Sequence, residues 1–202
     1  VNGSSGVAPI WVDKTGQNRI IVIPGANNLI DADIAIDSLS NIGPLDVLVG
    51  QFEIPLEVNE KVFEFAKNNG VQTVLNPAPA GNISEKLLNN TSWFIPNEIE
   101  FEEMLGEPFN ENALLKHSKE VNPEIIVTLG ENGCAEVSGG KVHIHQAKKV
   151  TAIDTTGAGD AFVGSFSYGL ASKMSKQDSI KLALEKATNS VTKKGTQSSY
   201  KD

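Results

Sequence analysis

The sequence predicts an α/β protein in which a largely parallel β-sheet is flanked by helices on both faces. Short continuous apolar runs, typical of buried strands, alternate along the chain with segments whose apolar residues recur at helical spacing. Parallel strands need a crossover between them, so this alternation favours a parallel sheet that helices cover on both sides. The length of 202 residues suits one large domain, or one domain with a small appendage.

The first 25 residues lack this alternation and predict a small β-hairpin. Residues 6–13 and 18–25 have the pattern of strands, and residues 14–17 between them contain the glycine of a turn. The hairpin lacks the covering helices of a parallel sheet. We therefore expect residues 1–25 to form hairpin strands beside the α/β part, which takes up residues 26–202.

After residue 25, helices and strands are expected in turn. Asp31 is a candidate N-cap of the first helix, and Gly70 is the expected stop of the second. In that second helix the apolar residues on one face are Val58, Val62, Phe63 and Ala66. The expected helices lie within residues 31–39, 55–70, 84–90, 98–106, 111–121, 159–173 and 176–193. The expected strands lie within residues 46–51, 71–76, 92–97, 124–130 and 150–154, with a hairpin at 133–146 that turns at Gly139-Gly140.

Composition argues against some classes of partner. The formal net charge is −8 and Arg19 is the single arginine, whereas a surface for nucleic acid or anionic lipid needs clustered basic residues. No apolar run is long enough to span a membrane, and no signal peptide is visible. The single cysteine, Cys134, cannot form an internal disulfide, and its alternating surroundings predict a strand residue. Neither nucleic acid nor a membrane is therefore an expected partner.

A glycine loop before the last two helices is the most specific motif. Residues 154–160 read DTTGAGD and lead from an expected strand into a helix that begins near Gly159-Asp160. Glycines 157 and 159 permit positive φ angles and close approach of the backbone to a ligand, and free N–H groups at the helix start form an anion site. With a phosphoryl group in that site, Asp160 could accept the proton of an attacking hydroxyl, although the helix terminus would depress its pKa. The alternative is that Asp160 only caps the helix.

Three further motifs follow expected strands, at the sheet edge where ligands bind in such folds. Asn97 and Glu100 lie on one side of a helix's first turn and suit Mg²⁺ bound through water; alternatively they are a cap and a solvated acid. Residues 128–133, TLGENG, either approach a ligand closely through their glycines or form an ordinary turn into the hairpin. Residues 76–80, NPAPA, predict a rigid loop whose polar contact is Asn76.

Together these motifs resemble the pfkB-type carbohydrate kinase family, and in particular its ribokinase branch. DTTGAGDAFVGSF resembles the family's C-terminal signature, and further motifs occur in the family's order, namely NPAPA, PNEIE, TLGENG and KKGTQSS. The segments QFEIPLE, SSGVAPIWVD and GQNRIIVIPGAN are similar to ribokinases specifically. The similarity extends from about residue 4 to the end, and it implies a ribokinase-like fold in which residues 1–25 are a small β lid.

The resemblance implies ATP-dependent phosphorylation of D-ribose at its 5-hydroxyl to give D-ribose 5-phosphate. By their match to the family's motifs, Asp160 is implied to be the catalytic base and to contact both sugar and nucleotide. Glu53 is implied to be a second sugar contact, and Glu100 is implied to hold Mg²⁺ through water. The implied anion hole consists of Gly157, Ala158 and Gly159. The implied nucleotide-binding residues are Asn97, Thr128, Leu129, Gly130, Glu131, Asn132, Gly133, Gly159 and Asp160.

The resemblance also implies how the lid acts and where the protein works. The lid covers the sugar and excludes water, which would otherwise compete as phosphoryl acceptor. Through the lid the full-length protein is expected to form a homodimer. The partners are then a small-molecule sugar and ATP, and the expected location is the cytoplasm.

A monovalent-cation site beside the anion hole is a further expectation. Asp154 lies six residues before Asp160, and its alternative role is that of an Asx residue that stabilises a turn. Residues 190–199 follow the last helix and contain a flexible glycine and several hydroxyls; backbone carbonyls with one carboxylate suit a large hard cation such as K⁺. The resemblance supplies the positions, which are Asp154, Thr156, Ser190, Lys193, Gly195 and Ser199.

The chain departs from the family at its start. Ribokinases begin with a further N-terminal segment, roughly a third of their chain. That segment carries most of the residues that contact the sugar, a di-glycine motif and strands in the middle of the sheet. We therefore expect this chain to be part of a longer kinase, with a truncated product as the alternative. Because the absent segment selects the sugar, a deoxyribose, fructose or nucleoside kinase is an alternative function. A nucleotide-binding fragment without turnover is another, which the presence of Asp160 and both loop glycines disfavours.

Overall fold

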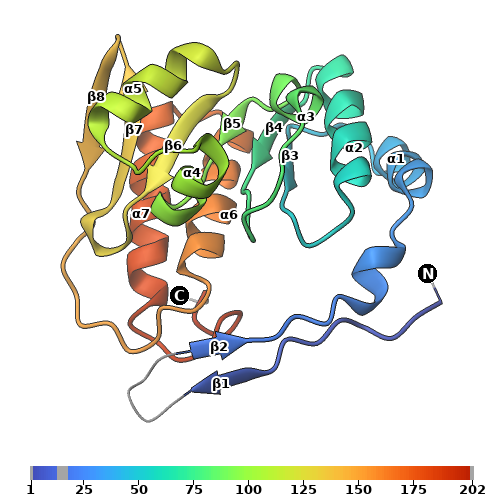
Figure 1. Cartoon of the computed structure of the whole chain (residues 1–202), viewed down its shortest axis with the longest axis horizontal. Helices are drawn as coiled ribbons and strands as arrows, with labels where there is room; N and C mark the ends of the chain where they lie inside the picture. Colours follow the sequence, from blue (N-terminus) through green and yellow to red (C-terminus); the bar gives the residue numbers. More distant parts are fainter. Residues whose placement is uncertain (1, 13–17, 201–202) are drawn as a thin grey trace.

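The computed structural model describes residues 2–12 and 18–200, and its main feature is a six-stranded sheet (Figure 1). The strands lie in chain order and are β3 (Val47–Gly50), β4 (Gln72–Leu75), β5 (Trp93–Phe94), β6 (Glu124–Thr128), β7 (Cys134–Ser138) and β8 (Lys141–His145). The first four are parallel, whereas β7 and β8 are antiparallel to the strands before them. The predicted largely parallel sheet is confirmed, and so is the hairpin that turns at Gly139-Gly140.

The helices follow the predicted alternation. They are η1 (Gly25–Leu29), α1 (Ala32–Asn41), α2 (Leu56–Asn68), α3 (Glu85–Asn89), α4 (Glu98–Leu105), α5 (Glu111–Glu120), η2 (Gly130–Asn132), α6 (Ala158–Ala171) and α7 (Lys176–Ser190). Asp31 caps α1 as predicted, because its carboxylate accepts the N–H groups of Asp33 and Ile34 at 2.9 and 3.1 Å. The predicted face of α2 is buried. Within the described part of the chain, no helix has the length and apolar character needed to cross a membrane.

The two faces of the sheet have separate hydrophobic cores, because successive strand residues point to opposite sides. On one face, Leu75 and Phe94 pack with the buried sides of α2 to α5. On the other face, Val74 and Trp93 pack against α6 and α7, and the rings of Trp93 and Phe166 meet edge to face at 5.1 Å between centroids. Figure 1 shows α6 and α7 side by side on one side of the sheet. The predicted covering of both faces by helices is confirmed.

The residues before α1 form a two-stranded antiparallel ribbon, which Figure 1 shows as an extended arm beside the main sheet. It consists of β1 (Ile10–Val12) and β2 (Asn18–Ile20), and a bridge between Val7 and Ile23 continues the pairing. The predicted strands are confirmed, whereas the predicted turn at 14–17 lies outside the described residues. Val7 and Ile23 are 55% and 53% exposed, so the ribbon presents apolar surface to solvent.

The strand predicted at residues 150–154 is wrong. Of the described strands, only β7 pairs with β8, and the chain after β8 is irregular up to α6. The N–H groups of Ile153 and Asp154 donate instead to the carbonyl of Val191, at 2.7 and 3.2 Å, just after α7. Val150 and Ile153 are 41% and 60% exposed, so their apolar spacing does not mark a buried strand. The loop before α6 is therefore attached to the end of α7 rather than to the sheet.

A buried ion pair joins β7 to the start of α7. Glu136 is 2% exposed, and its Oε2 lies 2.7 Å from Nζ of Lys176, which also contacts Oε2 of Glu124 at 2.8 Å. Burial opposes the charge on Lys176, but the hydrogen bonds to Glu124 and Glu136 outweigh it and raise the pKa of the ammonium group. Removal of the lysine would leave the buried carboxylate with only the contact between its Oε1 and Nε2 of His145, at 3.4 Å, which is a poor replacement for the ammonium charge.

Cys134 is the first residue of β7, as the predicted strand requires, and it is buried. Burial, together with the charge of Glu136, raises the pKa of its thiol to about 12. A thiol with such a pKa is protonated at neutral pH, so Cys134 is a packing residue and a poor nucleophile.

Candidate active site

The loops after the parallel strands meet at one edge of the sheet, where the carboxyl ends of these strands lie. Asn76, after β4, links the ends of the two strands beside it, β3 and β5. Its backbone N–H donates to the carbonyl of Gly50, and its Nδ2 donates to the carbonyl of Ile95, each at 3.0 Å. Asn97, after β5, forms an isolated bridge with Thr128 at the end of β6. The polar contact predicted for Asn76 is therefore a bond within the protein.

The predicted glycine loop leads directly into α6 and leaves N–H groups available at the start of the helix. Gly157 is the N-cap and has φ 77° and ψ 6°, a left-handed conformation that glycine adopts without strain. Ala158 donates a long bond of 3.3 Å to the carbonyl of Thr155. Among the hydrogen bonds of the described residues, none uses the N–H of Gly159 or Asp160. The start of α6 therefore has the free donors of an anion site.

Asp160 lies in the first turn of α6 but does not cap it, because the N-cap is Gly157 and no side chain makes a capping bond. The capping alternative for Asp160 is thus excluded. Although much of the residue is exposed, neighbouring groups partly desolvate its carboxylate and raise its pKa. The direction of this pKa shift is opposite to the depression expected from the helix terminus, and its cause is desolvation by burial. A carboxylate with a raised pKa is a stronger proton acceptor than an ordinary aspartate.

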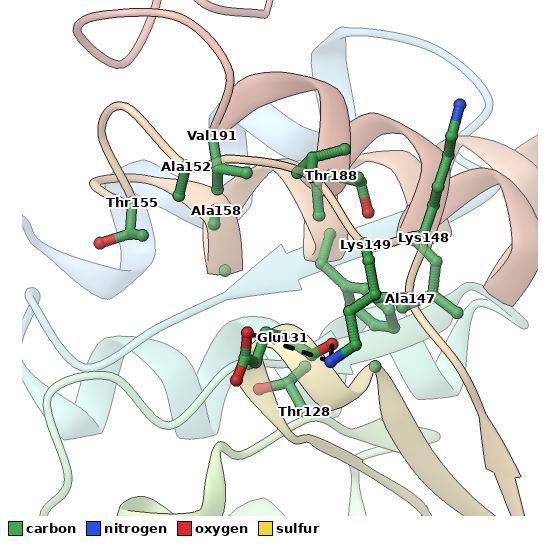
Figure 2. A pocket seen from close by; sticks show the side chains of 17 residues that line it. Thr128, Glu131, Ala147, Lys148, Lys149, Ala152, Thr155, Ala158, Thr188 and Val191 are labelled. Carbon is green, nitrogen blue, oxygen red and sulfur yellow. Dashed lines mark hydrogen bonds and ion pairs between the residues drawn. The ribbon is translucent and has the colours of Figure 1, made fainter.

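A cavity of about 310 Å³ lies between the turn after β6, the segment after β8, and the helices α6 and α7 (Figure 2). In Figure 2, Thr128 and Glu131 lie on one side of it and Thr155 and Ala158 on the other. The apolar lining residues are Ala147, Val150, Ala152, Ala158, Phe162, Leu184, Ala187 and Val191. A mainly apolar cleft with a few polar groups at its edge suits the flat base of a nucleotide.

Part of the predicted nucleotide site lines this cavity. The predicted residues that line it are Thr128, Gly130, Glu131, Gly133 and Gly159, together with Ala158 of the predicted anion hole. The predicted nucleotide residues that do not line it are Asn97, Leu129, Asn132 and Asp160. The structure therefore brings the TLGENG turn and the glycine loop to opposite sides of one cavity, although they are far apart in the sequence.

The TLGENG turn is closed by its own backbone. The N–H of Leu129 donates to the carbonyl of Gly133 at 2.8 Å, and the N–H of Gly133 donates to the carbonyl of Gly130 at 3.1 Å. Gly133 has φ 97°, and a Cβ there would lie 1.9 Å from the carbonyl oxygen of His145. Only glycine fits this position, and the tight turn presents Thr128 and Glu131 to the cavity.

Asn97 and Glu100 form a capping box at the start of α4. Oδ1 of Asn97 accepts the N–H of Glu100, and Oε2 of Glu100 accepts the N–H of Asn97, both at 2.8 Å. Asn97 is therefore a cap, but Glu100 is not the solvated acid of the alternative: it is 8% exposed, and burial raises the pKa of its carboxyl against the effect of the bond from Asn97.

The residues present fit a water-bridged magnesium ion better than a direct one. No group of three or more His, Cys, Asp or Glu side chains that could hold a metal is found in the described ranges. Mg²⁺ is usually bound through one or two carboxylates, waters and substrate phosphates, so it does not need such a group. Of the two oxygens of Glu100, Oε2 accepts the N–H of Asn97, and Oε1 is the candidate contact for a bridging water.

Asp154 joins the glycine loop to the segment after α7. Its Oδ1 accepts the N–H of Thr156 and its Oδ2 accepts that of Gly195, each at 3.0 Å. The bonds from Thr156, and then the one from Gly195, lower the pKa of this carboxyl. The Asx turn considered for Asp154 is present, and the structure also brings together the two loops predicted to hold K⁺.

The other predicted potassium ligands lie in the same segment. Ser190 and Ser199 are buried, and their hydroxyls donate to the carbonyls of Ala187 and Thr196 at 2.9 and 2.6 Å. The N–H of Lys193 donates to the carbonyl of Ser190 at 3.1 Å. Because these bonds fix the backbone of the segment, a cation there would be held mainly by carbonyl oxygens, which suit a large hard ion.

Glu53, the predicted sugar contact, is separate from the cavity. It is exposed in the loop between β3 and α2, and its N–H bonds to the side chain of Gln51. It follows a parallel strand, so it belongs to the same edge of the sheet as the other site residues.

Some residues of the site belong to no sequence motif that would identify them. Nζ of Lys149 donates to the carbonyl of Glu131 at 3.3 Å and points toward it across the cavity, whereas Lys148 points away (Figure 2). Leu184 and Thr188 of α7 complete the wall. Tyr200 donates from its hydroxyl to the carbonyl of Gly157 at 2.9 Å. A doubled lysine is the sole sequence signal here, and it equally suits a solvated loop.

The whole chain, residues 1–202, matches the sequence profile of the pfkB family carbohydrate kinases. The chain belongs to the pfkB family of carbohydrate kinases. Among curated pfkB relatives, a ribokinase from Haemophilus influenzae is 38% identical over 96% of this chain and 65% of its own length. A deoxyribokinase from Salmonella typhi is 36% identical over 98% of this chain and 66% of its own length. The chain thus spans about two thirds of the length of these relatives.

A solved pfkB structure gives the same result for the fold. The structure of Arabidopsis thaliana ribokinase complexed with ribose and ATP superposes with a TM-score of 0.86 at 28% identity. The match covers 98% of this chain and 66% of the plant protein. The predicted ribokinase-like fold is therefore confirmed for the part of the fold that this chain contains.

Proposed function

We propose that this chain is the nucleotide-binding and catalytic part of an ATP-dependent kinase that converts D-ribose to D-ribose 5-phosphate. The observation that carries the proposal is the position of Asp160. Its carboxylate lies in the first turn of α6, and the free N–H groups of that turn border the apolar cavity. A proton acceptor and an anion site are thus next to each other, as phosphoryl transfer to a hydroxyl requires.

In this reaction the base of ATP occupies the cavity and its phosphates lie against the N–H groups at the start of α6. Asp160 accepts the proton of the sugar 5-hydroxyl while the hydroxyl oxygen bonds to the γ-phosphorus. The bond from that phosphorus to the β–γ bridging oxygen breaks, and ADP leaves. Because the transition state is loose, N–H groups that stabilise the phosphoryl oxygens contribute most, and a single carboxylate is a sufficient base.

Two cations belong to the proposal. Glu100 would hold Mg²⁺ through a water, and the metal would neutralise charge on the β- and γ-phosphates. Asp154 and the carbonyls of the segment after α7 would hold K⁺. Because Asp154 also bonds the N–H of Thr156, a cation there would stabilise the loop that presents Gly157 and Gly159.

The sugar and the lid are proposed from the family. The Arabidopsis structure contains ribose, and the Haemophilus influenzae relative is a ribokinase. We infer that Glu53 contacts the sugar and that residues 1–25 cover it as a lid, with 26–202 as the α/β part. The exposed apolar side chains of the ribbon, including Trp11 and Ile21, suit contact with a sugar-bound active site or with a second subunit in a homodimer.

The test is a panel of acceptors assayed by release of ADP. The extended protein for this assay is the full-length product of the gene that encodes the 202-residue chain, so that any segment that selects the sugar is the protein's own. We expect D-ribose to give the highest kcat/KM among ribose, deoxyribose, fructose and adenosine. The 202-residue chain alone should bind MgATP but phosphorylate ribose poorly, because it covers two thirds of its relatives. Robust ribose kinase activity of the chain alone would contradict this part of the proposal.

The main alternative is a deoxyribose kinase, since the deoxyribokinase and the ribokinase are almost equally similar to this chain. A higher kcat/KM with deoxyribose than with ribose would replace the proposed substrate and leave the proposed chemistry intact. MgATP binding without transfer to any acceptor would favour the nucleotide-binding fragment and contradict the enzyme.

A further inference from the structure

Tyr200 contacts the glycine loop from the far end of the chain. Its hydroxyl donates to the carbonyl of Gly157 at 2.9 Å, across 43 positions of sequence. The same carbonyl accepts the N–H of Ala161 at 2.9 Å, the first backbone bond of α6. A Cβ on Gly157 would lie 2.2 Å from the hydroxyl oxygen, so a larger residue at this N-cap would have to displace the tyrosine side chain.

This contact fixes a peptide unit that carries one of the anion-site donors. The peptide between Gly157 and Ala158 is planar, so its carbonyl and its N–H point in opposite directions and turn together. Gly157 has no side chain to restrict this rotation, and the N–H of Ala158 makes only the 3.3 Å bond to Thr155. With both acceptor positions of the Gly157 carbonyl in use, the N–H of Ala158 is fixed as well.

The segment that carries Tyr200 is itself attached to the loop. Gly195 donates its N–H to Oδ2 of Asp154, at the start of the glycine loop. Ser199 is buried, and both its N–H and its hydroxyl donate to the carbonyl of Thr196, at 2.9 and 2.6 Å. The segment therefore holds the glycine loop at two points, through Asp154 at one end and through Tyr200 at the other.

Tyr200 also lies next to the proposed base. It borders a second cavity, of about 290 Å³, whose lining includes Asp160, Ser165 and Ser199. Burial, and then the negative charge of Asp160, raise the pKa of the Tyr200 phenol, so the hydroxyl keeps its proton at neutral pH and remains a donor. Tyr200 is 39% exposed and belongs to neither hydrophobic core of the sheet.

We propose that Tyr200 is a positioning residue of the α6 anion site: its hydroxyl holds the Gly157–Ala158 peptide so that the first-turn N–H groups face the phosphoryl group. The inference rests on the proposed kinase function for the role of the anion site, whereas its first test, the binding of inorganic phosphate, does not require kinase activity. The hydroxyl acts through the backbone and does not touch the substrate. Its loss should weaken anion binding and slow transfer without changing sugar affinity.

The variant Tyr200→Phe removes the hydroxyl alone, and Tyr168→Phe is the matched control. Tyr168 lies in α6 and is 66% exposed. The 202-residue chain is titrated with inorganic phosphate, and binding is followed by the ¹⁵N–¹H signals of Gly157 to Asp160. With Tyr200→Phe these signals should shift or broaden in the free protein, and phosphate should bind about 2- to 10-fold more weakly, the range for one hydrogen bond. Tyr168→Phe should change neither quantity.

Turnover and stability complete the test. In the extended protein, kcat of Tyr200→Phe should fall by a similar factor of about 2 to 10, while KM for the sugar stays constant. Wild-type phosphate affinity and unchanged Gly159 signals in Tyr200→Phe would overturn the proposal. A loss of phosphate binding that appears only at temperatures at which the variant unfolds would also overturn the proposal, because Tyr200 would then stabilise the fold without positioning the anion site. Failure of the kinase assay with all sugars refutes the function and leaves the phosphate titration informative about Tyr200.

Discussion

Replacement of Asp160 by asparagine separates catalysis from structure at the proposed site. Asparagine has nearly the shape of aspartate but cannot accept a proton in the reaction. Asp160 is not the N-cap of α6, which is Gly157, so no cap is lost. The cavity proposed for the nucleotide is lined by other residues, including Thr128 and Phe162, and not by Asp160. We therefore expect Asp160→Asn to change the transfer step and to leave nucleotide affinity nearly constant.

The expected loss of turnover follows from the role of the base. General-base catalysis contributes about 10²–10⁴-fold, and each factor of ten corresponds to about 1.4 kcal/mol in the barrier, so about 3–5 kcal/mol should be lost. Because desolvation raises the pKa of Asp160, the acid limb of the kcat profile should lie above that of an ordinary aspartate. Below that pKa the carboxyl is protonated and cannot act, so wild-type activity should fall there.

The same pKa fixes the sign of the effect on stability. A carboxyl whose pKa is raised in the folded state favours folding below its unfolded pKa, and this contribution disappears as the pH rises through the folded value. At neutral pH the charged carboxylate of Asp160 is therefore mildly unfavourable to the fold. The neutral Asp160→Asn variant should be at least as stable as the wild type, with a thermal midpoint that is equal or higher.

The assay compares three quantities in Asp160→Asn and in a control. Turnover is measured in the extended protein, and MgATP affinity and the thermal midpoint are measured in the 202-residue chain. The control is Asp178→Asn, at the equivalent position of α7, where the carboxylate of Asp178 accepts the hydroxyl of Ser175 at 2.7 Å. The control should lose some stability and no activity. Turnover of Asp160→Asn within tenfold of wild type, or a clear fall in its thermal midpoint, would refute the reasoning.

Three other changes test the cation sites and the buried ion pair. Asp154→Ala should abolish any preference for K⁺ over Na⁺ and Li⁺ in turnover, and its stability deficit should vanish as pH falls through the lowered pKa of Asp154; an unaltered potassium response in the variant counts against the site. Glu100→Gln keeps the capping box but should raise the Mg²⁺ concentration needed for half-maximal turnover about tenfold or more. The control Glu98→Gln, on the exposed side of α4, should leave that concentration unchanged, and equal concentrations in the two variants would contradict the magnesium role. Lys176→Ala removes the ammonium group beside the buried Glu136 and should lower the free energy of unfolding in urea by about 3 kcal/mol. Lys173→Ala, from the exposed pair with Asp46, should lower it by less than about 1 kcal/mol, and similar losses in the two variants would refute the difference between the buried and the exposed pair.

Much of the fold could be predicted because the pattern of apolar residues matches burial directly. The face of α2 and the alternation of Val74 and Leu75 between two cores follow from the spacing of apolar side chains. The segment 150–154 has the same apolar spacing and is not a strand. Its N–H groups bond to Val191, 37 or more residues away, and a contact of that kind leaves no local signal in the sequence.

The site was predictable where a motif contains both the residue and its geometric reason. Gly157 has the positive φ that its loop requires, and Gly133 occupies a position that only glycine fits. The environment of Asp160 was not predictable, because its desolvation depends on groups that the fold brings near it. Tyr200 is near the end of the chain and belongs to no motif, so its bond to the glycine loop appears only in three dimensions.

The most direct test of the central claim is to follow transfer from ATP to the sugar by ³¹P NMR. The extended protein is incubated with MgATP and D-ribose, and in parallel with 5-deoxyribose, which has no hydroxyl at the proposed acceptor position. We predict that ADP and ribose 5-phosphate form together in the first sample, that no sugar phosphate forms in the second, and that Asp160→Asn suppresses the first signal by about 100-fold or more. A sugar phosphate formed from 5-deoxyribose, or full ribose 5-phosphate production by Asp160→Asn, would contradict the account.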